Sequence, residues 1–303
     1  MTWNAEQLLS LSDGLSAVAA RAAESVVRVE GRRRAGSGVA WAADAILTAA
    51  HAVGDEDEVE VQLPSGEAVR GEVAGRDPGT DLAVVRLASP ATLPLPAWHD
   101  DVPAAGSLAL TLSRPGRAPR AGLALVARIS AGEWRAPGGA RLDRFVELDA
   151  SLFPGFSGGL VVDLAGRALG LANAGVVRGA ALALPPATLR RVAGALLSHG
   201  AVRRGYLGVA TIPVHLPSQL RTVAGQERGL LVSGLDEGGP AAQVGVVLGD
   251  VLLSAAGSAL AHPRDLAPLL EEDRIGEPLP LRVLRAGAPR DLALTIGARG
   301  GRS

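Results

Sequence analysis

The chain has 303 residues, with 30 basic and 31 acidic side chains and a formal net charge of −1. This length suggests two domains, and the balanced charge excludes a protein held mainly by nucleic-acid phosphates. Cysteine is absent, which excludes disulfide scaffolds, thiolate metal sites and a cysteine nucleophile. Aromatic residues make up only 3%, so stacking platforms for single-stranded nucleic acid are not expected.

The apolar residues are spread along the chain. They make up 48% of it, which suffices for sizeable cores, but no run approaches the ~18 consecutive apolar residues of a membrane span. The first ten residues contain Glu6 and lack the basic segment and apolar core of a signal peptide. The sequence therefore predicts a cytoplasmic protein, or an exported form whose leader has been removed.

The first two thirds of the chain are rich in predicted strands. A helix at Glu6–Ala23 precedes them, with Leu8, Leu11 and Leu15 on one face. Val59, Val61 and Leu63 alternate with polar residues, as in a half-buried strand. Many short strands separated by turns favour a barrel or sandwich over a βαβ layout. The predicted strands are Ser25–Glu30, Gly38–Trp41, Glu58–Leu63, Ala68–Val73, Leu82–Leu87, Ser107–Leu112, Leu123–Ile129, Phe145–Leu148, Leu160–Asp163 and Ala168–Ala172.

The last hundred residues form a second predicted domain. A helix at Ala187–His199 ends at Gly200, and we place the domain boundary near Ala201–Arg204. A compact α+β module is expected after it. Its predicted elements are strands at Gly229–Leu235, Asp250–Ala255, Leu279–Leu284 and Asp291–Ile296 and helices at Pro240–Val244 and Arg264–Glu272.

Three local motifs in the first predicted domain contain candidate catalytic residues, in the order His, Asp, Ser. They are Leu47-Thr48-Ala49-Ala50-His51, Asp77-Pro78-Gly79-Thr80-Asp81-Leu82 and Phe153-Pro154-Gly155-Phe156-Ser157-Gly158-Gly159. A serine hydroxyl is a weak nucleophile at neutral pH, so an imidazole must accept its proton during attack. A carboxylate can fix the tautomer of that imidazole, and glycines beside the serine let backbone N–H groups turn toward a developing oxyanion.

With these motifs, the sequence resembles the HtrA/Deg-type serine proteases, which join a trypsin-like domain to a PDZ domain. The resemblance implies a mainly β fold, with a trypsin-like double β-barrel followed by an α+β PDZ domain. It implies His51 as general base, Asp81 as the orienting carboxylate and Ser157 as nucleophile. The expected division is an N-terminal helical segment at 1–23, a protease domain at 24–200 and a PDZ domain at 201–299.

The resemblance also assigns the surroundings of the nucleophile. Backbone N–H groups of Gly155, Phe156 and Ser157 would form the oxyanion hole, and Leu152, Asn173 and Ala174 would line the primary pocket. No acidic side chain stands where a trypsin-like pocket would hold one. We therefore expect an apolar or small pocket and cleavage after Val, Ala, Ile or Leu.

This sequence departs from the family's usual pattern at several positions. Phe156 stands where the family has Asn, and Leu160 where it has Pro. The loop between the barrels reads Leu112-Ser113-Arg114-Pro115 instead of Gly-Asn-Pro. Asn173 replaces a hydroxyl residue expected to support the triad carboxylate, so the sequence does not fix the exact geometry of the triad.

In the second domain, Tyr206-Leu207-Gly208-Val209 resembles the carboxylate-binding loop of PDZ domains. The resemblance implies unfolded or damaged proteins as substrates, and C-terminal peptide segments as partners of the PDZ domain, which would regulate activity. It also implies a homo-oligomer, most simply a trimer, with contacts through the N-terminal segment. No metal, organic cofactor or nucleic-acid partner is expected.

Two alternatives remain at this stage. The barrels could be a catalytically idle or chaperone-like scaffold in which the PDZ domain is the working module, a reading motivated by Phe156 and Asn173. A zymogen-like resting state is also possible, in which the loop Arg128–Arg144 and the turn Gly155–Ser157 become ordered only when a ligand binds.

Overall fold

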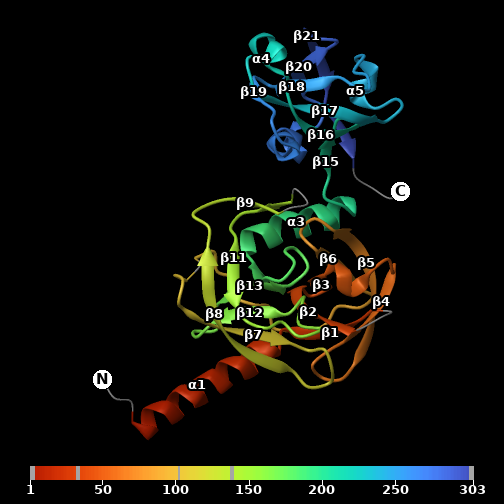
Figure 1. Ribbon diagram of the computed structural model, residues 1–303. Helices are drawn as coiled ribbons and strands as arrows, with labels where there is room; N and C mark the ends of the chain where they lie inside the picture. The colour runs from red at the N-terminus through yellow and green to blue at the C-terminus, as the bar shows by residue number, and fades with distance from the viewer. Residues whose placement is uncertain (1–3, 32–34, 102, 137–139, 300–303) are drawn as a thin grey trace. The chain divides into compact units, whose positions relative to one another are not determined.

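The structure is a computed structural model that describes residues 4–31, 35–101, 103–136 and 140–299 (Figure 1). The chain divides into two compact units between Ala201 and Val202. Within the described residues, no helix is both long and apolar enough to cross a membrane.

The first unit begins with helix α1 (Ala5–Ala23), close to the predicted range. Asn4 caps it, because its side chain accepts a hydrogen bond from the Gln7 N–H while the Gln7 side chain accepts one from the Asn4 N–H. The helix ends against β7 and β12, and much of its length stands clear of the barrels (Figure 1).

The first barrel is closed by antiparallel strands in the order β1-β2-β3-β6-β5-β4. In β4, buried valines alternate with exposed or half-buried polar residues, as the sequence predicts. Val27, Val61 and Val85 are among the residues that fill the interior. The elements of this barrel are β1 (Val26–Glu30), β2 (Ala35–Ala42), β3 (Ala45–Ala49), the one-turn helix α2 (Ala50–Val53), β4 (Glu58–Gln62), β5 (Ala68–Asp77) and β6 (Leu82–Leu87).

The second barrel has the order β11-β14-β13-β12-β7-β8 and is closed by the pairing of β11 with β8. Val126, Val161 and Leu169 belong to its core. Its strands are β7 (Leu108–Ser113), β8 (Arg120–Ile129), β11 (Val146–Asp149), β12 (Leu160–Asp163), β13 (Ala168–Asn173) and β14 (Ala181–Leu184), and a two-stranded ribbon of β9 (Trp134–Arg135) and β10 (Arg141–Leu142) extends from it.

Helix α3 (Pro186–His199) packs on β5 and β6 of the first barrel and on β13 of the second. Proline occupies its first turn, and Gly200 ends it in the left-handed conformation. Gly75 of β5 lies against this end of the helix, where an added Cβ would stand 2.4 Å from the Gly200 carbonyl oxygen. Glycine at position 75 therefore lets the barrel and helix meet.

The second unit is an α+β domain built on a sheet of order β16-β17-β18-β20-β21. Strand β16 is an edge strand, the position in a sheet where a proline such as Pro213 is tolerated. Leu230, Leu252 and Val283 lie in the core. The elements are β15 (Arg204–Tyr206), β16 (Val209–His215), α4 (Ser218–Ala224), β17 (Arg228–Leu235), α5 (Pro240–Gln243), β18 (Val251–Ala255), β19 (Ser258–Ala259), the 3-10 helices η1 (Pro263–Leu270) and η2 (Glu272–Arg274), β20 (Pro278–Arg285), β21 (Ala288–Thr295) and β22 (Gly297–Arg299).

The predicted fold class is confirmed, since two barrels of antiparallel strands are followed by a smaller α+β domain. One element differs in kind. The helix expected at Arg264–Glu272 is a 3-10 helix, η1, and Pro268 lies inside it. Proline cannot donate the hydrogen bond that an α-helix requires at an interior position.

Candidate active site

His51 lies in helix α2, directly after β3 of the first barrel. Its side chain is about half exposed, at 53%. Strand β2 passes close to this helix, and a Cβ on Gly36 would stand 2.6 Å from the Cβ of Ala52. Glycine at position 36 thus allows β2 to pack against the segment that carries the imidazole.

Asp81 faces His51 from the turn between β5 and β6. Its Oδ2 lies 2.6 Å from His51 Nδ1, and its Oδ1 accepts a hydrogen bond from the His51 N–H at 2.9 Å. Asp81 has a φ of 54°, which is unusual for a residue other than glycine. Asp77 stabilises the turn, since its carboxylate accepts hydrogen bonds from the Thr80 N–H and hydroxyl. The imidazole is therefore held at Nδ1, and Nε2 is left for chemistry.

The Asp81 carboxylate also changes the protonation of the imidazole. Its hydrogen bond with Nδ1 raises the pKa of His51 above the ordinary 6.5, burial opposes this shift, and the negative charge of Asp81 adds to it. A raised pKa makes the imidazole a better proton acceptor during attack by a hydroxyl.

Asn173, the last residue of β13, supports the same carboxylate. Its Nδ2 donates to Asp81 Oδ2 at 2.9 Å and to the Asp81 carbonyl at 3.3 Å. Its Oδ1 accepts from the N–H groups of Gly175 and Val176. The side chain is fully buried and is not among the residues that line the cleft at Ser157, although the sequence assigned it to the primary pocket. The amide supplies the hydrogen bond to the carboxylate that a hydroxyl residue was expected to give.

Gly175 lies against the hydrogen-bonded pair of His51 and Asp81. A Cβ there would lie 2.2 Å from Asp81 Oδ2 and 3.1 Å from His51 Nδ1. No side chain fits at this position without displacing the pair. The sequence motifs gave no signal for this role, because it depends on residues about 95 and 125 positions away along the chain.

Ser157 lies in the loop between β11 and β12 and is 6% exposed. Its Oγ accepts a hydrogen bond from the Ala174 N–H at 3.3 Å. Among the described residues, no hydrogen bond joins Ser157 Oγ to His51 Nε2. Catalytic hydrogen bonds are often long before substrate binds, and both side chains line the same cleft.

The residues before Ser157 form a tight turn. The Phe156 N–H donates to the Phe153 carbonyl at 3.0 Å, and Gly155 has a φ of 87°, the pattern of a type II turn with Pro154 at its second position. The Phe156 N–H, which was predicted as an oxyanion donor, is used to close this turn in the structure. In the part of the chain that the structure describes, the N–H groups of Gly155 and Ser157 have no partner.

The Phe156 ring lies under the loop. Its side chain is buried, its ring centroid is 6.0 Å from that of Phe153, and it approaches Gly122 of β8. The bulky substitution for the usual Asn is thus accommodated beneath the turn and away from the cleft. Phe153, by contrast, is 61% exposed.

The cleft at Ser157 has a volume of about 670 Å³. Leu152 and Ala174, which the sequence assigned to the primary pocket, line this cleft together with Phe153 and Gly155. Asp55 and Glu56 are the acidic side chains among the lining residues of this cleft, and they follow His51 in the chain. Leu152, Phe153, Pro154 and Ala174 contribute apolar side chains to the lining.

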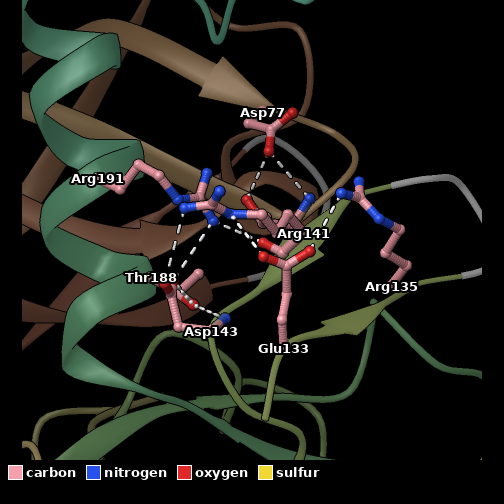
Figure 2. Close-up of polar contacts among 8 residues, drawn as sticks. Asp77, Glu133, Arg135, Arg141, Asp143, Thr188 and Arg191 are labelled. Carbon is pink, nitrogen blue, oxygen red and sulfur yellow. Dashed lines mark hydrogen bonds and ion pairs between the residues drawn. The ribbon is translucent and has the colours of Figure 1, made fainter. Parts of the chain in front are cut away.

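An ion pair and hydrogen bonds hold the loop between β8 and β11 against helix α3 (Figure 2). Asp143 accepts a hydrogen bond from the Thr188 hydroxyl at 2.8 Å and lies 3.6 Å from Arg191. Arg141 lies 3.5 Å from Glu133, and its carbonyl accepts a hydrogen bond from Arg191. The loop Arg128–Arg144 of the resting-state hypothesis thus has defined contacts in its described part, and residues 137–139 lie outside the described residues.

The second unit has its own hollow of about 340 Å³ beside the edge strand β16. Tyr206, Leu207, Gly208 and Val209 line it, and Leu266 of η1 forms the opposite wall. The Leu207 and Gly208 carbonyls accept hydrogen bonds from the N–H groups of Ala241 and Asp236. Among the described residues, the N–H groups of Leu207 and Gly208 have no partner, as a carboxylate-binding loop requires.

Groups of three or more His, Cys, Asp or Glu side chains with the arrangement of a metal site are absent from the described residues. The functional groups that line the first cleft include the Ser157 hydroxyl and the His51 imidazole.

Comparisons with known families find one matching domain in each of the two units of the chain. Residues 36–171 match the family described as trypsin-like peptidase domain, and residues 205–296 match the PDZ domain. The chain is 31% identical over 271 residues to the probable periplasmic serine endoprotease DegP-like of Brucella suis, covering 87% of this chain and 52% of that protein. It is 30% identical over 277 residues to the putative serine protease HhoB of Synechocystis, covering 86% and 66%. The chain thus spans about half the length of the first of these relatives.

Solved structures of proteases have a similar fold. The serine endoprotease from Yersinia pestis superposes with a TM-score of 0.73 at 26% identity, covering 94% of this chain and 97% of the other. The HtrA-type protease AlgW with decapeptide superposes with a TM-score of 0.73 at 25% identity, covering 96% and 99%.

Proposed function

Because the chain belongs to the HtrA/Deg-type serine proteases, with a trypsin-like peptidase domain followed by a PDZ domain, we propose that it hydrolyses peptide bonds in unfolded or damaged proteins. The observation that carries the proposal is the arrangement of Asp81, His51 and Ser157 around one cleft. Asn173 strengthens it, because it completes the hydrogen bonding of the carboxylate.

In the proposed reaction, Ser157 Oγ attacks the scissile carbonyl carbon while His51 Nε2 accepts the hydroxyl proton. The carbonyl π electrons move to oxygen, and the N–H groups of Gly155 and Ser157 stabilise the resulting oxyanion. When the oxyanion reverts to a carbonyl, the C–N bond breaks and His51 gives its proton to the leaving amine. Water then hydrolyses the acyl-enzyme by the same sequence and regenerates the Ser157 hydroxyl.

The primary specificity should follow from the apolar side chains of the cleft. Leu152 and Ala174 can contact a small or branched aliphatic side chain, and the acidic residues of the lining, Asp55 and Glu56, belong to the segment after His51. We therefore expect cleavage after Val, Ala, Ile or Leu.

The PDZ domain would bind C-terminal segments of proteins and regulate the protease. An extended peptide can add to β16 as a further strand, while the N–H groups of Leu207 and Gly208 bind its terminal carboxylate. Leu266 and Leu270 favour a hydrophobic C-terminal residue.

A homo-oligomer, most simply a trimer, also belongs to the proposal. Helix α1 presents large apolar side chains to solvent, with Leu8 54% and Leu9 65% exposed. Such side chains are typical of a surface that another subunit covers. Because the Brucella suis relative is named as a probable periplasmic protein, we propose the exported form over the cytoplasmic one.

The scaffold alternative was motivated by Phe156 and Asn173. Phe156 is buried beneath the turn, and Asn173 donates to the carboxylate that it was expected to leave unsupported. Neither position now argues for an idle site, so the protease is the function that we favour.

Labelling with a fluorophosphonate, followed by mass spectrometry, tests the proposed nucleophile. The modified residue should be Ser157, and labelling should be lost in His51→Ala, since the imidazole must accept the proton. Repeating the reaction with a peptide that ends in a hydrophobic residue tests regulation, because a resting state would label faster once the PDZ domain is occupied. Absence of labelling under both conditions would contradict the proposal.

A further inference from the structure

Ser37 is a fully buried residue of β2 that bonds to two residues of the nucleophile loop. Its hydroxyl donates to the Gly155 carbonyl at 2.6 Å, and its N–H donates to the Ser157 carbonyl at 3.3 Å. The N–H groups of Gly155 and Ser157 have no partner in the described structure. In the proposed mechanism, these two groups stabilise the oxyanion. One residue of the first barrel thus holds both oxyanion donors, which belong to the second barrel.

The Ser37 hydroxyl is itself oriented. The Arg114 N–H donates to Ser37 Oγ at 2.8 Å, so the oxygen lone pairs face Arg114 and the proton faces Gly155. The Ser37 carbonyl accepts a hydrogen bond from the Thr48 hydroxyl at 2.7 Å. The N–H, carbonyl and hydroxyl of Ser37 therefore all have partners, and the hydroxyl has one preferred direction.

The backbone of Ser37 also touches the nucleophile loop directly. A Cβ on Gly158 would stand 2.0 Å from the Ser37 carbonyl oxygen, so only glycine allows the two segments to approach this closely. Gly158 has a φ of 86°, a conformation that also favours glycine. The loop therefore has little freedom to move away from β2 or along it.

Arg114 anchors this arrangement to the start of the domain. Its guanidinium is buried and donates to the carbonyls of Ala23, Val26 and Arg117. No carboxylate pairs with Arg114 among the described residues, and burial lowers the pKa of its guanidinium. Since Ala23 is the last residue of α1, the cation lies at the negative end of the helix dipole. Arg114 is one of the positions at which the sequence departs from the family pattern.

We propose that Ser37 is a positioning residue for the oxyanion hole, oriented by Arg114. The proposal rests on the proposed function, because it concerns the stabilisation of the oxyanion formed on Ser157. The peptide unit between Gly155 and Phe156 is held at both ends, by Ser37 at its carbonyl and by Phe153 at its N–H. Removing the Ser37 hydroxyl would free one end and let the Gly155 N–H move away from the oxyanion.

The test compares wild type, Ser37→Ala and Ser113→Ala in the full chain. Ser113 is a matched control, because it is a fully buried serine next to Arg114 whose hydroxyl has no partner in the described structure. We expect Ser37→Ala to lower kcat on a peptide substrate by on the order of 10- to 100-fold, less than the loss of a whole oxyanion donor. KM should change by no more than about twofold, because substrate binding does not use the hydroxyl.

A spectroscopic measurement separates positioning from a general loss of structure. A peptidyl trifluoromethyl ketone enriched in 13C at its carbonyl should form a hemiketal with Ser157, and the 13C shift reports ionisation of the hemiketal oxygen. Ser37→Ala should raise the pKa of this oxygen, since its anion loses stabilisation, and Ser113→Ala should leave it unchanged. If Ser37→Ala fails to fold, Ser37→Cys retains a weaker donor and should show the same changes to a smaller degree.

The outcomes are distinct. Lower kcat with unchanged KM and a raised hemiketal pKa supports the positioning role. Equal kcat and equal hemiketal pKa for Ser37→Ala, Ser113→Ala and wild type would overturn it and leave the proposed function intact. Failure of the wild-type chain either to hydrolyse peptides or to form the hemiketal would overturn the proposed function itself.

Discussion

Asn173 Nδ2 and Asp81 Oδ2 are 2.9 Å apart, and the same carboxylate oxygen lies 2.6 Å from His51 Nδ1. One oxygen thus accepts hydrogen bonds from both an amide and an imidazole. Because Asn173 is fully buried and its own oxygen accepts two backbone N–H groups, the amide cannot rotate away without losing partners. Asn173 therefore fixes the direction in which the carboxylate faces the imidazole.

Asn173→Ala should lower kcat by about tenfold or more, since the carboxylate would lose the donor that orients it beside the general base. Asn173→Ser should recover part of this activity, because a hydroxyl can donate to the same oxygen. The measurement is kcat on a peptide substrate, with thermal unfolding as a check on folding. Equal kcat for Asn173→Ala and wild type would show that the amide has no positioning role.

The pH dependence follows from the His51–Asp81 pair. Activity requires the neutral imidazole, and the hydrogen bond to Asp81 raises the pKa of His51. Consequently kcat/KM should fall on the acid side with a midpoint above pH 6.5. Asp81→Asn removes both the acceptor and the charge, and should cost about 10⁴-fold in kcat, as in related triads. An acid midpoint below pH 6.5 in the wild-type protein would contradict the assignment.

Gly175→Ala should abolish most activity, because its Cβ would stand 2.2 Å from Asp81 Oδ2. The pair must shift to make room, which misplaces the imidazole. Gly194→Ala in α3 is the matched control, since an added Cβ there meets nothing within 4 Å. Alanine in a helix should stabilise this variant by roughly 0.5–1 kcal/mol and leave hydrolysis unchanged. Comparable activity in the two variants would argue against close packing at position 175.

We expect the folding stability of the PDZ domain to depend on the buried carboxylate of Asp250. Asp250 is fully buried, and Arg285 donates to its Oδ1 and Oδ2 at 2.7 Å each. Burial alone raises the pKa of Asp250, but the hydrogen bonds from Arg285 and Val247 outweigh it and hold the pKa below 3.8. The resulting stabilisation is present above pH 3.8 and is lost as the pH falls through the lower pKa of the folded state.

Asp250→Ala leaves the guanidinium without its partner and should lower the unfolding midpoint of this domain by on the order of 10 °C at pH 7. Asp291→Ala provides the comparison, because Asp291 is 82% exposed and lies 3.8 Å from Arg282. That exposed pair should shift the midpoint by only a degree or two. Calorimetry of the full chain measures both, and similar shifts would refute a special role for Asp250.

The sequence predicted β4 from its alternating side chains, and it also predicted the fully buried β12 and β13, but it missed other short strands. In β4, valines alternate with polar residues and the strand lies where it was expected. Strands β3 and β14 were missed; all their residues are buried, and a short apolar run without a period does not by itself identify a strand. Strand β16 was missed because Pro213 argues against a strand unless the strand lies at an edge.

The residues of the candidate site also differ in whether a local sequence pattern predicts their role. His51, Asp81 and Ser157 stand in local motifs, so the sequence brings them together as a hypothesis, and the structure places His51 beside Asp81 and in one cleft with Ser157. The roles of Asn173 and Ser37 depend on contacts about 90 and 120 positions along the chain. No local pattern contains such contacts, and so Asn173 was assigned to the pocket.

The central claim is that Ser157 hydrolyses peptide bonds. Its most direct test is degradation of an unfolded model protein by the full chain beside Ser157→Ala, with and without a peptide ending in a hydrophobic residue. We predict cleavage after small or aliphatic residues by the wild-type chain and a loss on the order of 10⁴-fold or more in the variant. Equal cleavage by both proteins, or none by the wild-type chain under either condition, would contradict the account.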